Sequence, residues 1–275
     1  MRLILLTTLT MSAFAANSIL NRMAVGPGDA DPGSFAALRT GAGAALLCVI
    51  VLLRGGQVPV FRTDRIWCAL ALAVYMVGFS TAYLTLDAGF GALLLFGVVQ
   101  IAMFGWNAAT QTPPTPRQLV GAAVAFAGLA WVLWPSGDAA INAGGAALMI
   151  AAGLGWAAYT LIGARGLDPV AATAGNFLLC VPIMLLALIL PADLVLTPRG
   201  AFLATLSGAV TSGLGYALWY SVIPSLGAAR AAVVQLSVPV IAIGMGLVLL
   251  GEVATSELIL GTALVLGGIA LALRR

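Results

Sequence analysis

Arg39 is the one charged residue that lies well inside an apolar run of this 275-residue sequence. It stands six residues into the run 33–53, about 9 Å along a helix that rises 1.5 Å per residue. Charges inside a membrane are costly and rare, so each is a candidate for function. Two interpretations stay open. The side chain extends to the outer interface, or it faces a cavity as a gate or as the contact for a substrate carboxylate. Asn176 stands at the corresponding depth in the second half and shares the latter role.

Uncharged polar and aromatic residues recur at helical spacing in the same apolar runs. Residues three and four apart share one face of a helix, so these sets predict stripes that stack on a flat solute and bond its polar groups. The candidates for substrate binding are Asn17, Phe79, Tyr83, Gln100, Trp156, Tyr159, Tyr216, Trp219 and Gln235. The competing interpretation is structural, because amides often bond a neighbouring helix and aromatic residues often anchor a helix end at the interface.

Gln235 is the first candidate among them because Pro239 follows it by four residues. Proline has no N–H, so the carbonyl of Gln235 is expected to lose its helical partner, and a helix break is predicted there. Such backbone is tolerated at membrane depth only inside protein or beside a wet cavity.

The residue types that are missing limit the function further. The chain has no His, and no Asp or Glu lies well inside an apolar run. The three cysteines stand apart, without the spacing of metal ligands. We therefore expect no metal, no cofactor and no enzyme activity on lipid-linked substrates. Exchange of protons for cationic drugs is disfavoured, because it needs a carboxylate inside the membrane. A neutral or zwitterionic solute fits the polar residues of the apolar runs better.

Composition indicates that lipid surrounds most of the chain. Of its residues, 62% are hydrophobic and 8% charged, whereas soluble domains have roughly 45–50% and about 25%. A membrane helix needs roughly 20 apolar residues. Ten such runs occur, near 3–24, 33–53, 66–86, 89–111, 117–134, 143–164, 170–190, 200–222, 227–249 and 256–273. We therefore predict an all-α integral membrane protein with ten transmembrane helices.

The distribution of charge predicts the orientation. If the N-terminus is cytoplasmic, most arginines fall in inner segments, while Arg199 and most acidic residues fall outside. Cytoplasmic loops are rich in Arg and Lys, so both termini are predicted to be cytoplasmic. The N-terminal segment imitates a secretory signal, with Ala13 and Ala15 at a cleavage-like site. Its apolar run is long enough to span, so we expect a retained first helix.

The two halves of the sequence repeat each other. The matched residues include Asp31-Pro32 with Asp168-Pro169, Gln100 with Gln235, and Gly121 and Gly128 with Gly261 and Gly268. The halves 1–138 and 139–275 would each hold five spans. An odd number inverts the second copy, as in many secondary transporters. We expect a central cavity lined by spans 1, 3, 4, 6, 8 and 9, with 5 and 10 peripheral. The glycine faces predict helix packing or a dimer contact.

The closing stretch of the chain carries a family resemblance. Pro239, Leu250-Gly251-Glu252 and Gly267-Gly268 resemble the final pattern of the drug/metabolite transporter superfamily, in its ten-span EamA branch. The first half departs from that pattern, because Phe104 occupies the position that corresponds to Pro239 of the second half. Overall, the sequence is most similar to aromatic amino-acid exporters of the YddG type.

The resemblance implies a bacterial inner-membrane exporter of aromatic or neutral amino acids and related metabolites, working by alternating access. The alternative is a drug, nucleotide-sugar or other metabolite carrier of the same superfamily. The expected partners are the small solute and the lipid bilayer, without nucleic acid. The oligomeric state is left open, a monomer included.

Overall fold

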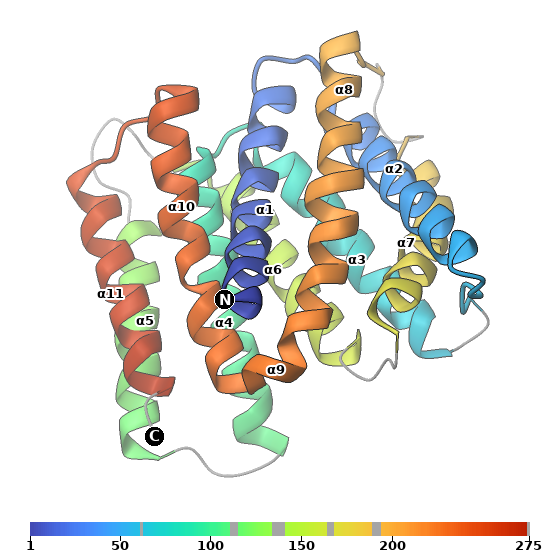
Figure 1. The fold of residues 1–275 in the computed structure, drawn as a ribbon. Helices are drawn as coiled ribbons and strands as arrows, with labels where there is room; N and C mark the ends of the chain where they lie inside the picture. Colours follow the sequence, from blue (N-terminus) through green and yellow to red (C-terminus); the bar gives the residue numbers. More distant parts are fainter. Residues whose placement is uncertain (61–62, 111–114, 134–140, 164–167, 189–193, 274–275) are drawn as a thin grey trace.

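The structure of this chain is a computed structural model that describes residues 1–60, 63–110, 115–133, 141–163, 168–188 and 194–273. Figure 1 shows a bundle of helices. In chain order they are α1 (Arg2–Val25), α2 (Pro32–Leu53), α3 (Thr63–Ala82), α4 (Ala88–Thr110), α5 (Pro116–Leu133), α6 (Ala143–Gly163), α7 (Pro169–Ala187), α8 (Pro198–Leu206), the π-helix η1 (Ser207–Leu214), α9 (Gly215–Gln235), α10 (Ser237–Met245), the π-helix η2 (Gly246–Leu250) and α11 (Ser256–Leu273). The described part of the chain has no strand beyond an isolated bridge between Ala30 and Leu196.

Seven of the described helices are long and apolar enough to cross a membrane. They are Arg2–Val25, Pro32–Leu53, Asp64–Ala82, Ala88–Thr110, Ala143–Gly163, Pro169–Leu186 and Pro198–Leu226. Three shorter apolar helices accompany them, at Pro116–Val132, Ser237–Leu250 and Ser256–Ala272. The all-helical membrane class is therefore confirmed. The count of ten spans in two inverted repeats stays a prediction, and the proposed boundary at 138/139 lies outside the described residues.

The repeated Asp-Pro pairs start two helices as expected. The Asp31 side chain accepts a hydrogen bond from the Ser34 N–H at the start of α2. The Asp168 side chain accepts from Val170 and Ala171 at the start of α7. A proline at the first helical position loses no needed N–H, so both pairs are complete helix-start signals.

The predicted eighth and ninth spans have different limits in the structure. Helical structure continues from Pro198 through η1 to Gln235, past the expected break at 223–226. It is interrupted at Leu236 instead, before α10. Pro239 explains that position, because it has no N–H to donate to the carbonyl four residues earlier. In Figure 1 the chain descends along α8 and η1, reverses at α9 and rises along α10.

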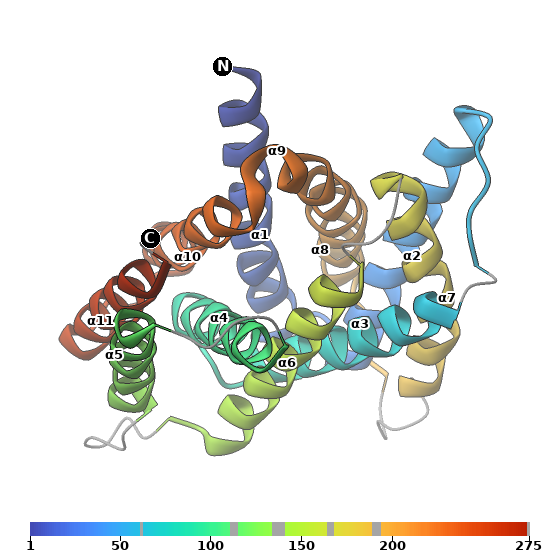
Figure 2. The ribbon, with the colours of Figure 1, turned by 90° about the horizontal axis from the view of Figure 1, so that it is seen from below.

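The helices are arranged around α1, α4 and α6. α1 contacts α9, α10 and η1, whereas α6 contacts α3 and α4. α5 packs on α11 at one edge of the bundle, and α2 packs on α7 toward the other (Figures 1 and 2). Helices five positions apart in the predicted order run in opposite directions. α1 rises where α6 descends, α4 descends where α10 rises, and α5 rises where α11 descends (Figure 1).

The α5–α11 contact is built from the repeated glycines. A Cβ added at Gly121 would overlap the carbonyl oxygen of Gly268, and a Cβ at Gly268 would lie 2.6 Å from that of Gly121. Small residues let two membrane helices approach this closely. The glycine faces therefore pack against each other inside one chain.

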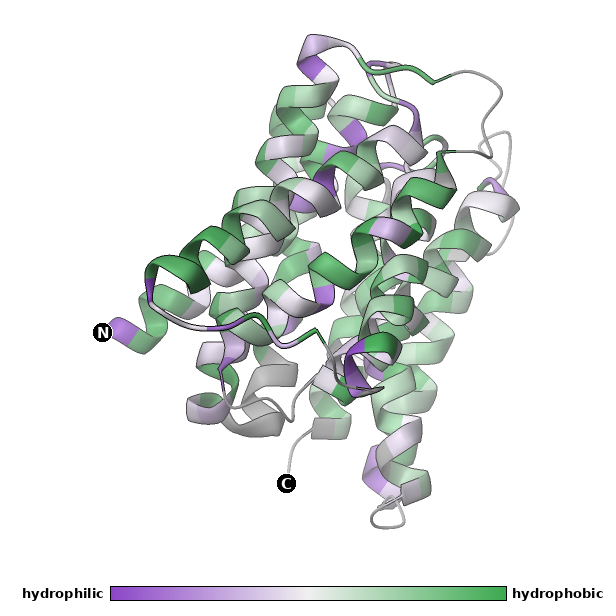
Figure 3. Cartoon of the chain, turned by 90° about the vertical axis from the view of Figure 1, so that its right-hand side faces the viewer, coloured by the Kyte–Doolittle hydropathy of each residue, from purple (hydrophilic) through white to green (hydrophobic). Residues whose placement is uncertain are grey.

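The outward helix faces are apolar. Figure 3 shows hydrophobic residues along the outer surfaces of the helices, with hydrophilic residues nearer the loops and in the interior. Exposed large side chains include Leu9, Val74, Phe126, Phe202 and Val248. A soluble protein seldom exposes such a surface, and lipid is the solvent that suits it.

Candidate functional site: a buried arginine beside an aromatic cavity

Arg39 lies inside the helix bundle, with 0% of its surface exposed. Its Nε donates to the Ser212 hydroxyl at 2.8 Å, and its Nη2 donates to the hydroxyls of Tyr75 at 3.1 Å and Tyr216 at 3.0 Å. The guanidinium carbon also lies 5.0 Å from the ring centre of Phe79. The guanidinium therefore does not extend to the outer interface, while its role as a gate or as the contact for a substrate carboxylate stays a prediction.

The π-helix η1 brings the second half of the chain against Arg39. Gly208 of η1 has no side chain, and a Cβ there would overlap the carbonyl group of Arg39. This close approach places Ser212 within reach of the guanidinium. π-helical turns inside α-helices are frequent at functional sites, and η1 serves here to join α2 with the α8–α9 segment.

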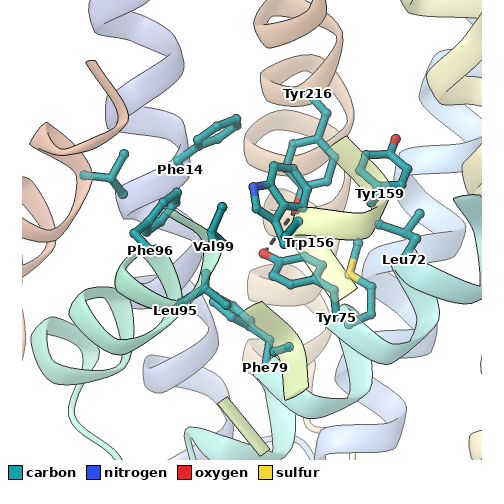
Figure 4. Packing of buried hydrophobic residues seen from close by; sticks show 14 of the residues in the cluster. Phe14, Leu72, Tyr75, Phe79, Leu95, Phe96, Val99, Trp156, Tyr159 and Tyr216 are labelled. Carbon is teal, nitrogen blue, oxygen red and sulfur yellow. Dashed lines mark hydrogen bonds between the residues drawn. The ribbon is translucent and has the colours of Figure 1, made fainter. Parts of the chain in front are cut away.

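Figure 4 shows a cluster of aromatic rings, and one of them, Tyr75, lies with its ring centre 5.4 Å from the guanidinium carbon of Arg39. Trp156 of α6 is at its centre, 4.6 Å from Tyr216 and 5.1 Å from Tyr75 between ring centres. Phe14 of α1 meets Trp156 edge-on at 5.7 Å. The Tyr216 hydroxyl donates to the Tyr75 hydroxyl at 3.2 Å, which fixes the two phenols between the rings and Arg39.

A narrow cavity opens among these rings. Its lining consists of Phe14, Asn17, Ser18, Tyr75, Phe79, Leu95, Phe96, Trp156 and Tyr216. The lining comes from α1, α3, α4, α6 and α9, so both halves of the chain contribute. Two buried N–H donors at the site have no hydrogen-bond partner, the Nη1 of Arg39 and the indole Nε1 of Trp156. The cavity's volume of about 10 Å³ leaves room for little more than one water molecule in this state, so a flat solute that accepts hydrogen bonds would enter only as the rings move apart.

Asn17 anchors the cavity wall to η1. Its side-chain oxygen accepts hydrogen bonds from the hydroxyls of Ser207, Thr211 and Ser212. Its amide nitrogen donates to the backbone carbonyl of Thr211 at 3.2 Å. A residue of the first predicted half thus organises the π-helix of the second.

The residues singled out from the sequence fall into three groups. Asn17, Phe79, Trp156 and Tyr216 line the cavity. Tyr83, Tyr159 and Trp219 lie one ring behind it, in contact with Phe79, Trp156 and Phe14 respectively. The last group is buried but does not line the cavity, and it consists of Gln100, Gln235 and Pro239. The Oε1 of Gln235 has no hydrogen-bond partner.

Asn176 belongs to a second buried polar cluster. Its Oδ1 accepts from the Nη1 of Arg65 at 3.3 Å, and its Nδ2 donates to the Tyr159 hydroxyl at 3.2 Å. The Tyr159 ring then stacks on Trp156 at 5.5 Å. The cluster therefore touches the cavity through one ring and does not line it.

Sequence reasoning missed several members of the site. They are Ser18, Arg65, Tyr75, Leu95, Phe96 and Ser212. Tyr75 had a usable signal, because it stands one helical turn before Phe79 on the same face. Arg65 lies near the start of α3, and only 4% of its surface is exposed.

The cavity has no ionised acid among its lining residues. Within the described ranges, no group of three or more His, Cys, Asp or Glu side chains is placed to hold a metal. The chemistry available at this site is binding by stacking, hydrogen bonding and one positive charge.

Comparison with known proteins agrees with this description. The chain is 46% identical to the uncharacterized protein PA1977 of Pseudomonas aeruginosa over 99% of its own length and 94% of that protein. It is 26% identical to the uncharacterized transporter YwfM of Bacillus subtilis over 90% and 86% of the two lengths. A solved crystal structure superposes with a TM-score of 0.71 over 97% of both chains, at 18% identity, a likeness that concerns the fold alone.

Residues 143–274 match the EamA-like transporter family. This family lies in the drug/metabolite transporter superfamily, and membership implies a multi-pass membrane protein that transports small solutes. Over residues 143–274, the chain therefore carries a domain of the EamA-like transporter family.

Proposed function

We propose that this protein is a secondary transporter that exports aromatic or neutral amino acids and related metabolites. The solute occupies the cavity beside Trp156 and Tyr216, and the two halves of the chain rock to open it to one side of the membrane at a time. The observation that carries the proposal is the pairing of an aromatic cavity with a fully buried arginine. Aromatic rings bind an aromatic side chain, and a guanidinium binds a carboxylate.

Helix packing supports two inverted halves. In the predicted repeat, α2, α4 and α5 correspond to α7, α10 and α11, and each of these pairs is in contact. The contact of α3 with α6 has a counterpart in that of η1 with α1, and the contact of α4 with α6 in that of α10 with α1. Such reciprocal contacts are those of a pseudo-two-fold axis, the symmetry by which inverted repeats alternate their openings.

The remaining predicted residues take supporting roles in this proposal. Tyr83, Tyr159 and Trp219 hold the cavity rings in place from behind. Gln100 on α4, and Gln235 at the end of α9 before the helix break at Pro239, supply polar groups for the movement of the two halves. Asn176, held by Arg65, acts as a gate at the opposite end from Arg39.

The proposed location is a bacterial inner membrane with both termini in the cytoplasm. The distribution of arginines along the sequence supports this orientation. With this orientation, the Ala30–Leu196 bridge lies on the outer side, and the state described here has its two halves joined at the outer mouth.

The test is exchange transport by purified protein in proteoliposomes. Labelled L-phenylalanine is placed inside the liposomes and unlabelled L-phenylalanine outside, and loss of label from the interior is measured. Wild type and Trp131→Leu are expected to exchange label alike, because Trp131 is exposed on the outer face of α5. Trp156→Leu is expected to lose at least about tenfold in kcat/KM, since a stacking surface and an indole N–H are removed together. Equal exchange by all three proteins would contradict the proposed site, and no exchange by the wild type would contradict the proposed substrates.

A further inference from the structure

The positive charge of Arg39 has no counter-ion in the described part of the protein. Its hydrogen-bond partners are a serine and two tyrosines, all neutral, and its Nη1 has none. Two ion pairs of described side chains lie elsewhere, between Arg22 and Asp87 and between Arg199 and Asp29. A buried charge without a partner is strongly disfavoured, so a bound anion would stabilise this site.

The groups around Arg39 present hydrogen-bond donors. The Tyr75 hydroxyl accepts from both Arg39 and Tyr216, which leaves its own hydrogen for a ligand. The indole N–H of Trp156 has no partner, and Trp156 and Tyr75 both line the cavity. Two lining residues thus hold a free N–H and a free O–H, and the Tyr75 hydroxyl is bonded to the guanidinium of Arg39. Donors next to a positive charge favour a carboxylate oxygen.

An ammonium group finds no equivalent partner in the same cavity. Its lining residues include no carboxylate. The amide oxygen of Asn17 already accepts from three hydroxyls, so it has little capacity left for a further donor. A zwitterion would leave the site with a net positive charge, because its ammonium and its carboxylate cancel. A monoanion would make the occupied site neutral.

We infer that the preferred cargo is an aromatic monocarboxylate that carries no ammonium group. This inference rests on one part of the proposed function, namely that the transported solute binds in the cavity. It names the preferred class among the amino acids and related metabolites of that function, which is an organic monoanion ahead of a zwitterionic amino acid.

A monoanion also removes the need for a coupled ion. Moving one elementary charge across the membrane changes its free energy by about 2.3 kcal/mol per 100 mV of membrane potential. A bacterial cytoplasm is electrically negative, so the potential drives an anion outward. The described spans offer no carboxylate to carry a coupled proton in the cavity, and export of an anion down the potential requires none.

The experiment uses purified full-length protein in liposomes at pH 7.4, with labelled 3-phenylpropanoate as the probe. L-Phenylalanine and phenethylamine are the unlabelled competitors, since each keeps the ring and changes only the charged groups. Valinomycin with a tenfold K⁺ gradient sets the potential, and protein-free liposomes give the passive background. With the interior positive, uptake above background is expected to accelerate at least about threefold, toward about tenfold accumulation at equilibrium. L-Phenylalanine is expected to compete at least about tenfold more weakly, and phenethylamine not at all.

Two variants test the role of the site without depending on one substitution. Arg39→Gln is expected to abolish uptake of 3-phenylpropanoate. Tyr75→Phe keeps the ring and removes only the hydroxyl, so it is expected to raise KM for 3-phenylpropanoate about tenfold with little change in kcat. Competition by a neutral amide of the probe should be unaffected in Tyr75→Phe, which a general loss of packing would not allow.

The outcomes separate the two proposals. Transport of L-phenylalanine without transport of 3-phenylpropanoate, or uptake that ignores the potential, would overturn the inference of a monoanion and leave the transport site standing. Failure of the wild type to carry either compound would contradict the proposed function itself.

Discussion

The Nη2 atom of Arg39 lies 3.0 Å from the hydroxyl oxygen of Tyr216. Arg39 belongs to α2 and Tyr216 to α9, so this bond joins the two predicted halves of the chain at the wall of the cavity. If one half rocks against the other, the bond between Arg39 and Tyr216 must either lengthen or move together with both halves. In the proposed mechanism, this pair would couple occupancy of the cavity to the relative position of the halves.

Arg39→Lys tests whether geometry matters as well as charge. A lysine ammonium is a compact point charge and lacks the planar fork that reaches Ser212, Tyr75 and Tyr216 together. We expect kcat/KM for the transported solute to fall at least about tenfold, while the melting temperature in detergent shifts by only a few degrees. Initial rates in proteoliposomes give the measurement. Wild-type rates in the lysine variant would mean that the charge alone suffices.

Gly268→Ala tests the contact between α5 and α11. The added Cβ would lie 2.6 Å from the carbonyl oxygen of Gly121 and closer to the backbone nitrogen of Ala125. Overpacking of this kind costs about 1–3 kcal/mol, so the melting temperature in detergent should fall. The neighbouring Gly267→Ala is the matched control, because nothing lies within 4 Å of its added Cβ. Equal melting of both variants would show that the helices separate at no cost.

Glu252 is expected to make stability depend on pH. Its carboxylate accepts from the backbone N–H of Ala88 at 2.6 Å and of Gly89 at 3.2 Å, at the start of α4. Burial raises the pKa of this carboxyl above its ordinary 4.5, and nearby Asp87 adds to the effect, while the two N–H bonds and Arg22 oppose it. The folded protein then holds a proton that the unfolded chain releases. The contribution to stability is present below the ordinary pKa and is lost as pH rises through the raised one.

The measurement compares wild type with Glu252→Gln between pH 4 and pH 7. Glutamine cannot ionise, so the melting temperature of the wild type relative to the variant should fall as pH rises across that window. A difference between the two proteins that stays constant, or that grows with pH, would contradict the raised pKa.

A cross-link between residues 30 and 196 should stop transport. Ala30 and Leu196 face each other in an antiparallel bridge, flanked by hydrogen bonds from Asp31 to Val195 and from Thr197 to Asp29, both of 2.8 Å. Opposed residues of this type have Cα atoms about 4.5 Å apart, within the range of a disulfide. Cysteines at both positions, with Cys48, Cys68 and Cys180 replaced by alanine, should oxidise readily.

Oxidation is expected to lower transport to background and dithiothreitol to restore it, since the joined loops can no longer separate. Each single-cysteine variant controls for the substitution itself. Unchanged transport by the oxidised double variant would mean that this end of the molecule does not open during the cycle.

The sequence predicts the helices where local chemistry decides their limits. Asp31-Pro32 and Asp168-Pro169 start α2 and α7 because each pair satisfies or omits the free N–H groups of a first helical turn. It predicts less at the expected break of 223–226, because α9 continues through Pro224. A proline inside a helix removes one hydrogen bond, and the helix continues at Pro224 whereas it is interrupted at Leu236, before Pro239.

The sequence predicts the residue types of the site better than it predicts which neighbours their side chains face. Its position along the helix places Arg39 inside the apolar run. The sequence does not state which neighbour the side chain faces, so it leaves open whether Arg39 extends to the outer interface or faces a cavity. Tyr75 and Ser212 become partners of Arg39 only through the packing of α3 and η1 on α2. Gln235 shows the converse, since it is buried at a real helix break and still does not line the cavity.

The most direct test of the central claim, that the solute occupies this cavity, is protection of an introduced thiol. Phe96→Cys places the thiol in the cavity wall on α4, and Trp106→Cys places a control on the exposed part of the same helix. Both are made in the background without Cys48, Cys68 and Cys180, and both are treated with a methanethiosulfonate reagent. We predict that a saturating transported solute slows labelling at position 96 at least about fivefold and leaves position 106 unchanged. Equal labelling at position 96 with and without the solute, in protein that still transports it, would contradict the account.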